Sequence, residues 1–355
     1  MATFLDFFLE PVKPFLDDDN VSEILINGPE TIYVERAGRL ELTEARFANE
    51  AALLATAVNI ARSVGRLLDD ANPRLDARLE NGSRVHAVIP PLARCGTTIA
   101  IRKFHKDPLS IAKMHASGSL DDAMIRLLSA AVRLHRNIIV SGGTSSGKTS
   151  VLNALSSFVP ADERILVLED ASELQLQQPH AVYFETRRPD KHGQGEVTIR
   201  DLIHSALRLR PDRLIIGEIR GGEAIDLLQA LNTGHAGSMS TLHANTPIDS
   251  LYRLETCALM SGINLPLRAI RSQIASAIDL VVQTERLADK SRKIVAIAEV
   301  LPLEDGEYAV RELVRWRTEQ LGEDGRLIGH FERLATPSFA EDAKRLGLCA
   351  QGESL

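Results

Sequence analysis

The spacing of hydrophobic and polar positions changes once along the chain, near residue 120. Before that point, apolar and polar residues alternate over short runs bounded by turns such as Asn27-Gly28 and Asn81-Gly82. Residues 48–64 instead carry apolar residues at helical spacing. The alternation predicts six short strands, and with the helix it indicates a small α+β domain. The predicted strands cover residues 22–26, 31–35, 39–42, 74–79, 84–89 and 97–102.

After residue 120, continuous apolar runs alternate with segments of helical period. Such runs are typical of strands buried on both faces of a parallel sheet, so this part is predicted to be a doubly wound α/β domain. Residues 293–316 read as added strands, antiparallel to the rest. The parallel strands are predicted at residues 137–141, 164–168, 213–217, 239–242 and 279–283.

These patterns give four predicted parts of the chain. Residues 1–105 form the N-terminal α+β domain, and residues 106–119, with a proline and a glycine, form a linker. Residues 120–316 form the larger α/β domain. Residues 317–355 form a tail, in which the Ser338–Glu341 spacing predicts a capping box that opens a short docked helix ending at Gly347.

Composition narrows the class of protein. The chain has 355 residues and a formal net charge of −7, and only 4% of its residues are aromatic. A broad nucleic-acid footprint is therefore not expected. The three cysteines lie far apart without metal-site spacing, which favours a reduced, cytoplasmic protein. No uncharged run is long enough to span a bilayer, so any membrane association is expected through a partner or a surface contact.

The most informative motif follows the first buried strand of the larger domain. It comprises Gly142, Gly143, Thr144, Ser145, Ser146, Gly147, Lys148 and Thr149. A strand, a glycine loop and a helix in this order match a loop whose backbone N–H groups cradle nucleotide phosphates. Lys148 is predicted to reach the β- and γ-phosphates, and the Thr149 hydroxyl to bind Mg²⁺. The chain is therefore expected to bind ATP.

Two later strands end in carboxylates. Strand 164–168 is followed by Glu169, with Glu173 close behind, and strand 213–217 is followed by Glu218. Carboxyl ends of parallel strands face the ligand crevice, so these acids can hold Mg²⁺ or orient an attacking water. Glu218 matches a Walker-B acid. Two alternatives stay open: Glu169 as a solvated loop acid, and Glu218 in a salt bridge to Arg220.

His243 follows a further strand of the same sheet. A neutral imidazole there could sense the γ-phosphate or form a hydrogen bond with Glu169, whereas a purely structural role is the alternative. His235 lies in a glycine-flanked loop, and no metal-site spacing surrounds either histidine.

Three arginines of the first domain, Arg84, Arg94 and Arg102, have no evident acidic neighbour in the sequence. A guanidinium is permanently charged and planar, so such residues can act as arginine fingers that neutralise phosphoryl charge. The alternative is solvated or salt-bridged positions at the edge of the sheet.

Four segments in order resemble the motifs of the secretion traffic ATPases. They correspond to the Walker A, Asp box, Walker B and His box of that superfamily. The segments are 141–149, 168–179, 210–224 and 233–245. Residues 81–103 and 184–190, with Asp324-Gly-Arg and Pro337-Ser-Phe near the end, look most similar to the CpaF subfamily of Tad/Flp pilus assembly ATPases.

This resemblance implies a RecA-like P-loop ATPase domain behind a smaller N-terminal domain, assembled as a hexamer. It gives Glu218 the catalytic Walker-B role, which includes holding Mg²⁺ with Thr149, and gives Glu169 and His243 the Asp-box and His-box roles. Arg84 and Arg102 fall at the arginine-finger positions. It further implies an inner-membrane platform protein as partner, and a function in powering pilin export or assembly.

Two departures and three alternatives remain. Many CpaF proteins carry an N-terminal helical bundle that is not seen here, and Ser145 stands where glycine is commoner in pilus motors. A type IV secretion or conjugation ATPase is the alternative within the superfamily. A scaffold that binds ATP without hydrolysing it is a different class, disfavoured by intact Glu218 and His243. A DNA translocase is disfavoured by charge and low aromatic content.

Overall fold

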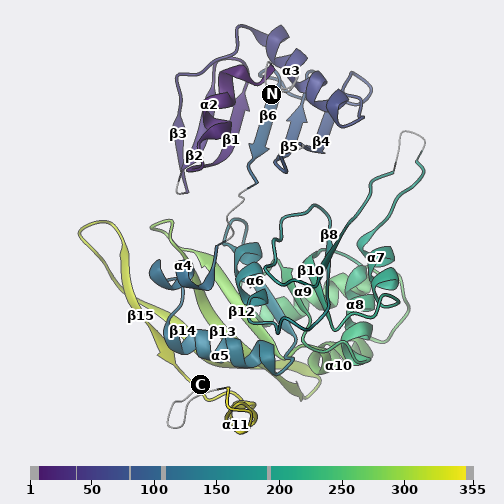
Figure 1. Cartoon of the computed structure of the whole chain (residues 1–355), viewed down its shortest axis with the longest axis vertical. Helices are drawn as coiled ribbons and strands as arrows, with labels where there is room; N and C mark the ends of the chain where they lie inside the picture. The colour runs from purple at the N-terminus through teal and green to yellow at the C-terminus, as the bar shows by residue number, and fades with distance from the viewer. Residues whose placement is uncertain (1–7, 37, 80, 105–108, 190–192, 349–355) are drawn as a thin grey trace. The chain divides into compact units, whose positions relative to one another are not determined.

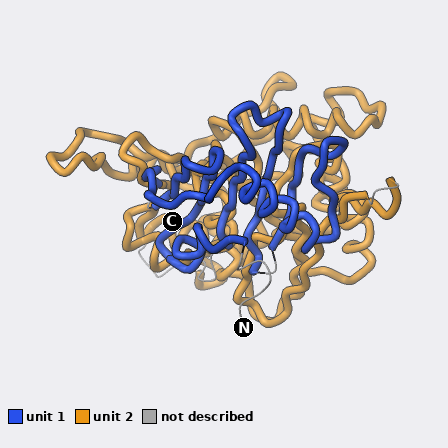
Figure 2. Tube along the Cα trace, turned by 90° about the horizontal axis from the view of Figure 1, so that it is seen from above, with its two compact units in different colours: residues 1–107 blue, residues 108–355 orange. Residues whose placement is uncertain are grey.

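The computed structural model describes residues 8–36, 38–79, 81–104, 109–189 and 193–348. The chain divides into two compact units, Met1–Asp107 and Pro108–Leu355, which Figure 2 distinguishes by colour.

Unit 1 contains a six-stranded antiparallel sheet in the order β3-β2-β1-β6-β5-β4. Alternate residues such as Ile24, Ile26 and Val34 are buried in one core with Leu53 and Ile60 of α3, so helices cover one face of the sheet. The Asn49 side chain accepts a hydrogen bond from Ala52 N and caps α3. The elements are η1 (Glu10–Val12), α2 (Lys13–Asp17), β1 (Val21–Asn27), β2 (Ile32–Arg36), β3 (Arg39–Leu42), α3 (Glu50–Ser63), β4 (Arg74–Arg78), β5 (Arg84–Val88) and β6 (Thr98–Arg102).

Unit 2 is built on a nine-stranded sheet in the order β15-β14-β13-β12-β7-β11-β10-β8-β9 (Figure 1). The strands from β12 to β9 pair in parallel, and β13, β14 and β15 extend the sheet antiparallel. The strands are β7 (Ile138–Gly142), β8 (Ile165–Glu169), β9 (Ala181–Glu185), β10 (Arg213–Ile219), β11 (Met239–Leu242), β12 (Leu280–Arg286), β13 (Arg292–Glu304), β14 (Glu307–Leu321) and β15 (Leu327–Arg333).

Helices cover both faces of this sheet. Ile138 and Val140 of β7 pack into one apolar cluster with α4, α5, α6 and α11, whereas Ile139 packs into the other with α7 to α10. The predicted α/β class with a parallel sheet and helices on both faces is therefore confirmed. The helices are α4 (Ile111–Ala116), α5 (Asp122–Arg133), α6 (Lys148–Ser156), α7 (Ile199–Ala206), α8 (Glu223–Asn232), α9 (Pro247–Leu259), α10 (Leu267–Ala277) and α11 (Ala340–Arg345).

Four local features differ from the sequence prediction. Helix α4, with buried Met114, lies in the range predicted as a linker, because Ser110 caps it. Strand β9 was missed; its apolar run is only four residues long, and none of its residues is fully buried. Strand β14 continues to Leu321 and β15 follows it, in the range predicted as a tail. Helix α11 has no capping box, because the Ser338 hydroxyl donates to Glu299 instead.

The predicted docking of the C-terminal helix is seen. Phe339, Ala340 and Ala343 are buried in the same cluster as α5 and α6. Among the described residues, no helix has the length and apolar character needed to cross a bilayer.

Candidate functional site

The phosphate loop connects the carboxyl end of β7 to the amino end of α6. Gly142 has φ 157°, and a Cβ atom on it would lie 2.4 Å from the Thr284 carbonyl oxygen, so only glycine fits there. Gly147 has φ 97° and directly precedes α6. The amino end of a helix therefore points into the loop, with the partial positive charge that favours a phosphate.

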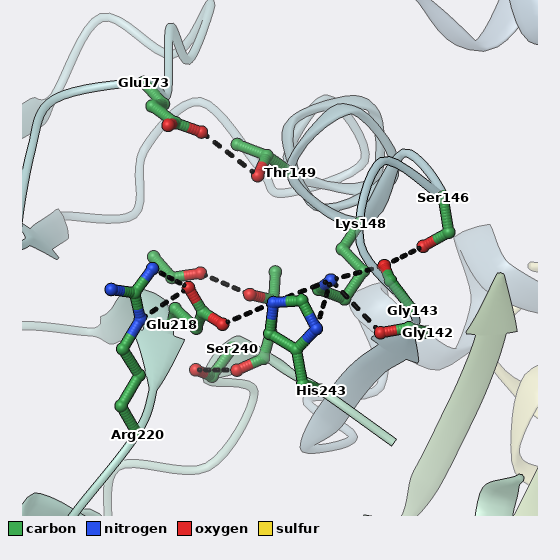
Figure 3. Close-up of polar contacts among 12 residues, drawn as sticks. Gly142, Gly143, Ser146, Lys148, Thr149, Glu173, Glu218, Arg220, Ser240 and His243 are labelled. Carbon is green, nitrogen blue, oxygen red and sulfur yellow. Dashed lines mark hydrogen bonds and ion pairs between the residues drawn. The ribbon is translucent and has the colours of Figure 1, made fainter. Parts of the chain in front are cut away.

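Lys148 is almost buried, with 8% of its surface exposed. Its ammonium donates to the carbonyl oxygens of Gly142 at 3.1 Å and Gly143 at 2.9 Å (Figure 3). The ammonium therefore lies within the turn of the loop itself, where a phosphate group would be held.

Glu218 is the second-to-last residue of strand β10, and both of its carboxylate oxygens have partners. Oε1 lies 2.9 Å from Nε2 of His243, and Oε2 accepts hydrogen bonds from Nε of Arg220, at 2.8 Å, and from its Nη2. Figure 3 shows the carboxylate between these two side chains. The salt bridge to Arg220, left open as an alternative role for Glu218, is thus present together with the His243 contact.

His243 joins Glu218 to the phosphate loop. Its ring nitrogens lie 3.3 and 3.4 Å from Nζ of Lys148. Burial, and next the Lys148 ammonium, lower the pKa of His243 below its ordinary value, although Glu218 acts in the opposite direction. The neutral tautomer with its hydrogen on Nε2 can donate to Glu218 while Nδ1 faces Lys148. The contact with Glu218 replaces the predicted hydrogen bond to Glu169.

Glu169, at the end of β8, is only 3% exposed and is not a solvated loop acid. Its Oε1 accepts hydrogen bonds from the backbone N–H groups of Glu173, at 2.8 Å, and Leu174, at 2.9 Å. Burial raises its pKa to about 7, against the effect of these two hydrogen bonds. A Cβ on Gly217 would lie 3.0 Å from Glu169 Cγ, so the missing side chain lets this acid lie against the backbone of β10.

Oxygen donors suited to Mg²⁺ gather beside the loop. The Thr149 hydroxyl lies 3.4 Å from a carboxylate oxygen of Glu173, and Glu218 ends the neighbouring strand β10. Hydroxyl and carboxylate oxygens are the ligands that Mg²⁺ prefers. Within the described ranges, no group of three or more His, Cys, Asp or Glu side chains could hold a metal ion by itself. The donors present therefore fit a Mg²⁺ that is completed by nucleotide phosphates, as is usual for this ion.

In unit 1, Arg84 and Arg102 lie directly opposite each other on β5 and β6. Glu23 of β1 is opposite Arg102 on its other side, which the sequence did not suggest because 79 residues separate them. Arg94 lies in the loop between β5 and β6. The structure therefore brings Arg84 and Arg102 together, whereas Arg94 lies outside the strands.

Three interactions of this region were not foreseen: Thr149 with Glu173, His243 with Lys148, and Arg292 Nε with the Ser145 carbonyl oxygen at 3.0 Å. The spacing along the chain gives no signal for the last two. Arg292 is a basic residue at the start of β13, but nothing in the sequence connects it with Ser145.

Comparison with known proteins gives a consistent result. The family model for type II/IV secretion system proteins matches residues 8–327. A putative conjugal transfer protein of Mycobacterium tuberculosis is 36% identical over 315 residues, covering 87% of this chain and 88% of that protein. The type IV secretion system protein VirB11 of Brucella suis is 32% identical over 309 residues, covering 79% of this chain and 85% of the relative.

Among solved structures, the Legionella pneumophila ATPase DotB matches with a TM-score of 0.56. The match covers 85% of this chain and 81% of DotB at 21% identity. At that identity the likeness supports the fold alone.

Proposed function

This chain belongs to the type II/IV secretion system protein family, and we propose that it is a motor ATPase that hydrolyses ATP at the phosphate loop. The observation that carries the proposal is the connected set Glu218, His243 and Lys148, which links the acid of β10 to the loop. A scaffold that only bound ATP would need the loop, but not an acid held beside it.

Binding is assigned to the loop residues Gly142 to Thr149. Backbone N–H groups of the loop and of the first turn of α6 would surround the phosphates, and Lys148 would exchange its two carbonyl acceptors for phosphate oxygens. Thr149 and Glu218 would help to hold Mg²⁺, which neutralises phosphoryl charge when it is bound.

Hydrolysis is assigned to Glu218, which would orient and polarise the attacking water. Arg220 and the neutral His243 already donate to this carboxylate, so the loss of either contact would leave a carboxylate oxygen better able to accept a proton from water. A phosphate attracts both Lys148 and Arg220, and its arrival would therefore release Glu218. Glu169 supports this arrangement by fixing the turn at residues 169–174 against β10.

Arg84 and Arg102 are proposed as arginine fingers in an assembled homohexamer. The two guanidinium groups lie at opposite positions of adjacent strands, so together they can offer two permanent positive charges to a polyphosphate. These arginines belong to unit 1 and the phosphate loop to unit 2. If the arginines contact the phosphates during hydrolysis, the reaction would be linked to movement between the units.

We propose that the motor belongs to a Tad/Flp pilus system and powers pilin export or assembly. It would act from the cytoplasmic side, through an inner-membrane platform protein. The support is the resemblance of residues 81–103, 184–190, 324–326 and 337–339 to the CpaF subfamily. Of these, residue 190 lies outside the described residues.

A second candidate is a conjugation or type IV secretion ATPase. It is favoured by the names of the two relatives at 36% and 32% identity, one for conjugal transfer and one for type IV secretion. The genes beside this one distinguish the candidates. Pilin, prepilin peptidase and platform-protein genes would support the pilus, whereas coupling-protein and relaxase genes would support conjugation.

The ATPase proposal itself is tested by phosphate release from ATP by the purified full chain, with Mg²⁺ and with excess EDTA. Release that depends on Mg²⁺ is the expected result. Nucleotide binding without release under any condition would instead favour the scaffold.

A further inference from the structure

The outer side of the phosphate loop packs against the ends of two strands that lie outside the four motifs. Thr284 of β12 donates to the Ser141 carbonyl oxygen at 3.0 Å, and its hydroxyl lies 2.8 Å from that of Ser146. The backbone of Thr284 is what a Cβ at Gly142 would strike. The end of β12 thus fixes the first half of the loop.

Arg292, the first residue of β13, contacts the tip of the loop. Its Nε donates to the Ser145 carbonyl oxygen at 3.0 Å, and its Cδ would lie 3.5 Å from a Cβ on Gly147. Ser145 has φ 58°, a conformation that is unfavourable for a residue other than glycine. A hydrogen bond to the carbonyl of this residue stabilises the peptide orientation that the loop needs.

Arg292 also brings positive charge to the loop. In the β12–β13 pair, Arg286 lies directly opposite Arg292. Like charges at such positions destabilise a sheet, whereas a polyanion held in the adjacent loop would reduce the repulsion. The two arginines thus place positive charge beside the loop, which favours a polyanion there.

The same end of β13 is tied to residues 117–119, which follow α4. The Ser119 hydroxyl donates to the Arg292 carbonyl oxygen at 2.7 Å, and Ile294 N donates to the Ser119 carbonyl at 3.0 Å. Lys293 Nζ donates to the Gly118 carbonyl at 2.7 Å. Residues 117–119 are among the first of unit 2, so they connect its start to the strand that bears Arg292.

We propose that Arg292 is a positioning residue that holds the tip of the phosphate loop. Ser119 would couple the first segment of unit 2 to the loop, because it binds the backbone of Arg292, whose side chain binds Ser145. The inference rests on the proposed nucleotide site and extends it. The competing role for Arg292 is direct contact with the base or ribose of the nucleotide.

The test uses the full chain with Arg292→Ala and the conservative Arg292→Lys. Arg317→Ala is the matched control, since Arg317 pairs with Glu332 across β14 and β15. Binding is measured by competition of ATP and of inorganic tripolyphosphate against a fluorescent ADP. Thermal unfolding establishes that each variant is folded.

Arg292→Ala is expected to weaken ATP and tripolyphosphate binding alike, by about 5-fold, the size of one exposed hydrogen bond. KM for ATP should rise by a similar factor with kcat within about 2-fold, and Arg292→Lys should recover part of the loss because lysine can still donate. A loss for ATP alone would overturn the proposal in favour of base or ribose contact. Binding equal to that of the control would also overturn it.

Transmission through Ser119 is tested by a double-mutant cycle. Ser119→Ala should weaken nucleotide binding in the wild-type background and have no further effect in the Arg292→Ala background. Equal effects in both backgrounds, or none in the wild type, would overturn transmission through Arg292. If the wild-type chain binds no nucleotide, the proposed function fails first and this inference fails with it.

Discussion

Nε2 of His243 lies 2.9 Å from Oε1 of Glu218, and the same imidazole is within 3.4 Å of the Lys148 ammonium. One imidazole ring therefore connects the acid of β10 to the lysine of the phosphate loop. Because this ring is 45% exposed, a nucleotide can reach it, and it is suited to respond to what the loop holds.

The first prediction concerns protonation of His243. Its pKa is lowered from 6.5, so the ring is neutral at and above that pH, and kcat should fall only at pH values below 6.5 as the ring gains a proton beside Lys148. In His243→Asn this acidic limb should be absent and kcat should be about 10-fold lower throughout, the loss of one charge-assisted hydrogen bond. The measurement is kcat from pH 5 to 8 for both proteins. An unchanged limb in the variant would exclude His243 as its origin.

The second prediction concerns the stability of the fold around Glu169. Its pKa is raised from 4.5 to about 7, so the folded state binds this proton more tightly than the unfolded chain does. The stability that follows is fully present below pH 4.5 and is lost as the pH rises through 7. Glu169→Gln keeps an oxygen for the two backbone donors and carries no charge.

Urea unfolding of both proteins at pH 4.5 and pH 8 measures this effect. The unfolding free energy of Glu169→Gln minus that of the wild type should be about 3 kcal/mol larger at pH 8 than at pH 4.5. A difference between the proteins that does not change with pH would contradict a buried carboxyl with a raised pKa.

The third prediction concerns Lys148. Its ammonium lies among the loop carbonyls, so Lys148→Ala should weaken ATP binding at least about 10-fold, through loss of a charged donor to phosphate. Lys344→Ala, on α11, is the matched control and should bind normally. Equal affinity of the two variants in a fluorescent-nucleotide titration would place the nucleotide elsewhere.

The fourth prediction concerns the arginines of unit 1. Arg102→Ala should lower ATP turnover in the assembled protein at least about 10-fold, as expected for removal of an arginine finger. Arg74→Ala, on β4 of the same sheet, is the control because it removes the same charge away from the Arg84–Arg102 pair. Nucleotide binding at one subunit should be similar in both. Equal turnover of the two variants would remove Arg102 from the site.

Local sequence patterns predicted the parts of the fold in which a single segment determines its own structure. The apolar runs at 137–141 and 213–217 and the glycines of the loop were sufficient for β7, β10 and the turn between β7 and α6. Strand β9 was missed because its side chains are partly exposed, and α4 because six residues are too few for a period to be recognised.

Contacts between segments far apart in the chain were harder to predict from the sequence. Sequence order placed Glu218 and His243 at the same edge of the sheet. It did not show that His243 contacts Glu218 and not Glu169, because that contact depends on how the strands pack. Likewise, β1 brings Glu23 opposite Arg102, and β13 brings Arg292 to Ser145. Pairing of strands far apart in the chain decides these contacts, and no single segment encodes them.

The central claim is that Glu218 serves hydrolysis and not merely a salt bridge, and phosphate release by Glu218→Gln tests it most directly. The amide oxygen can still accept a hydrogen bond from Arg220, but the amide cannot accept a proton from water, so MgATP binding should be retained while phosphate release falls at least about 100-fold. Glu332→Gln, on β15, should release phosphate normally. Near-normal release by Glu218→Gln would contradict the account.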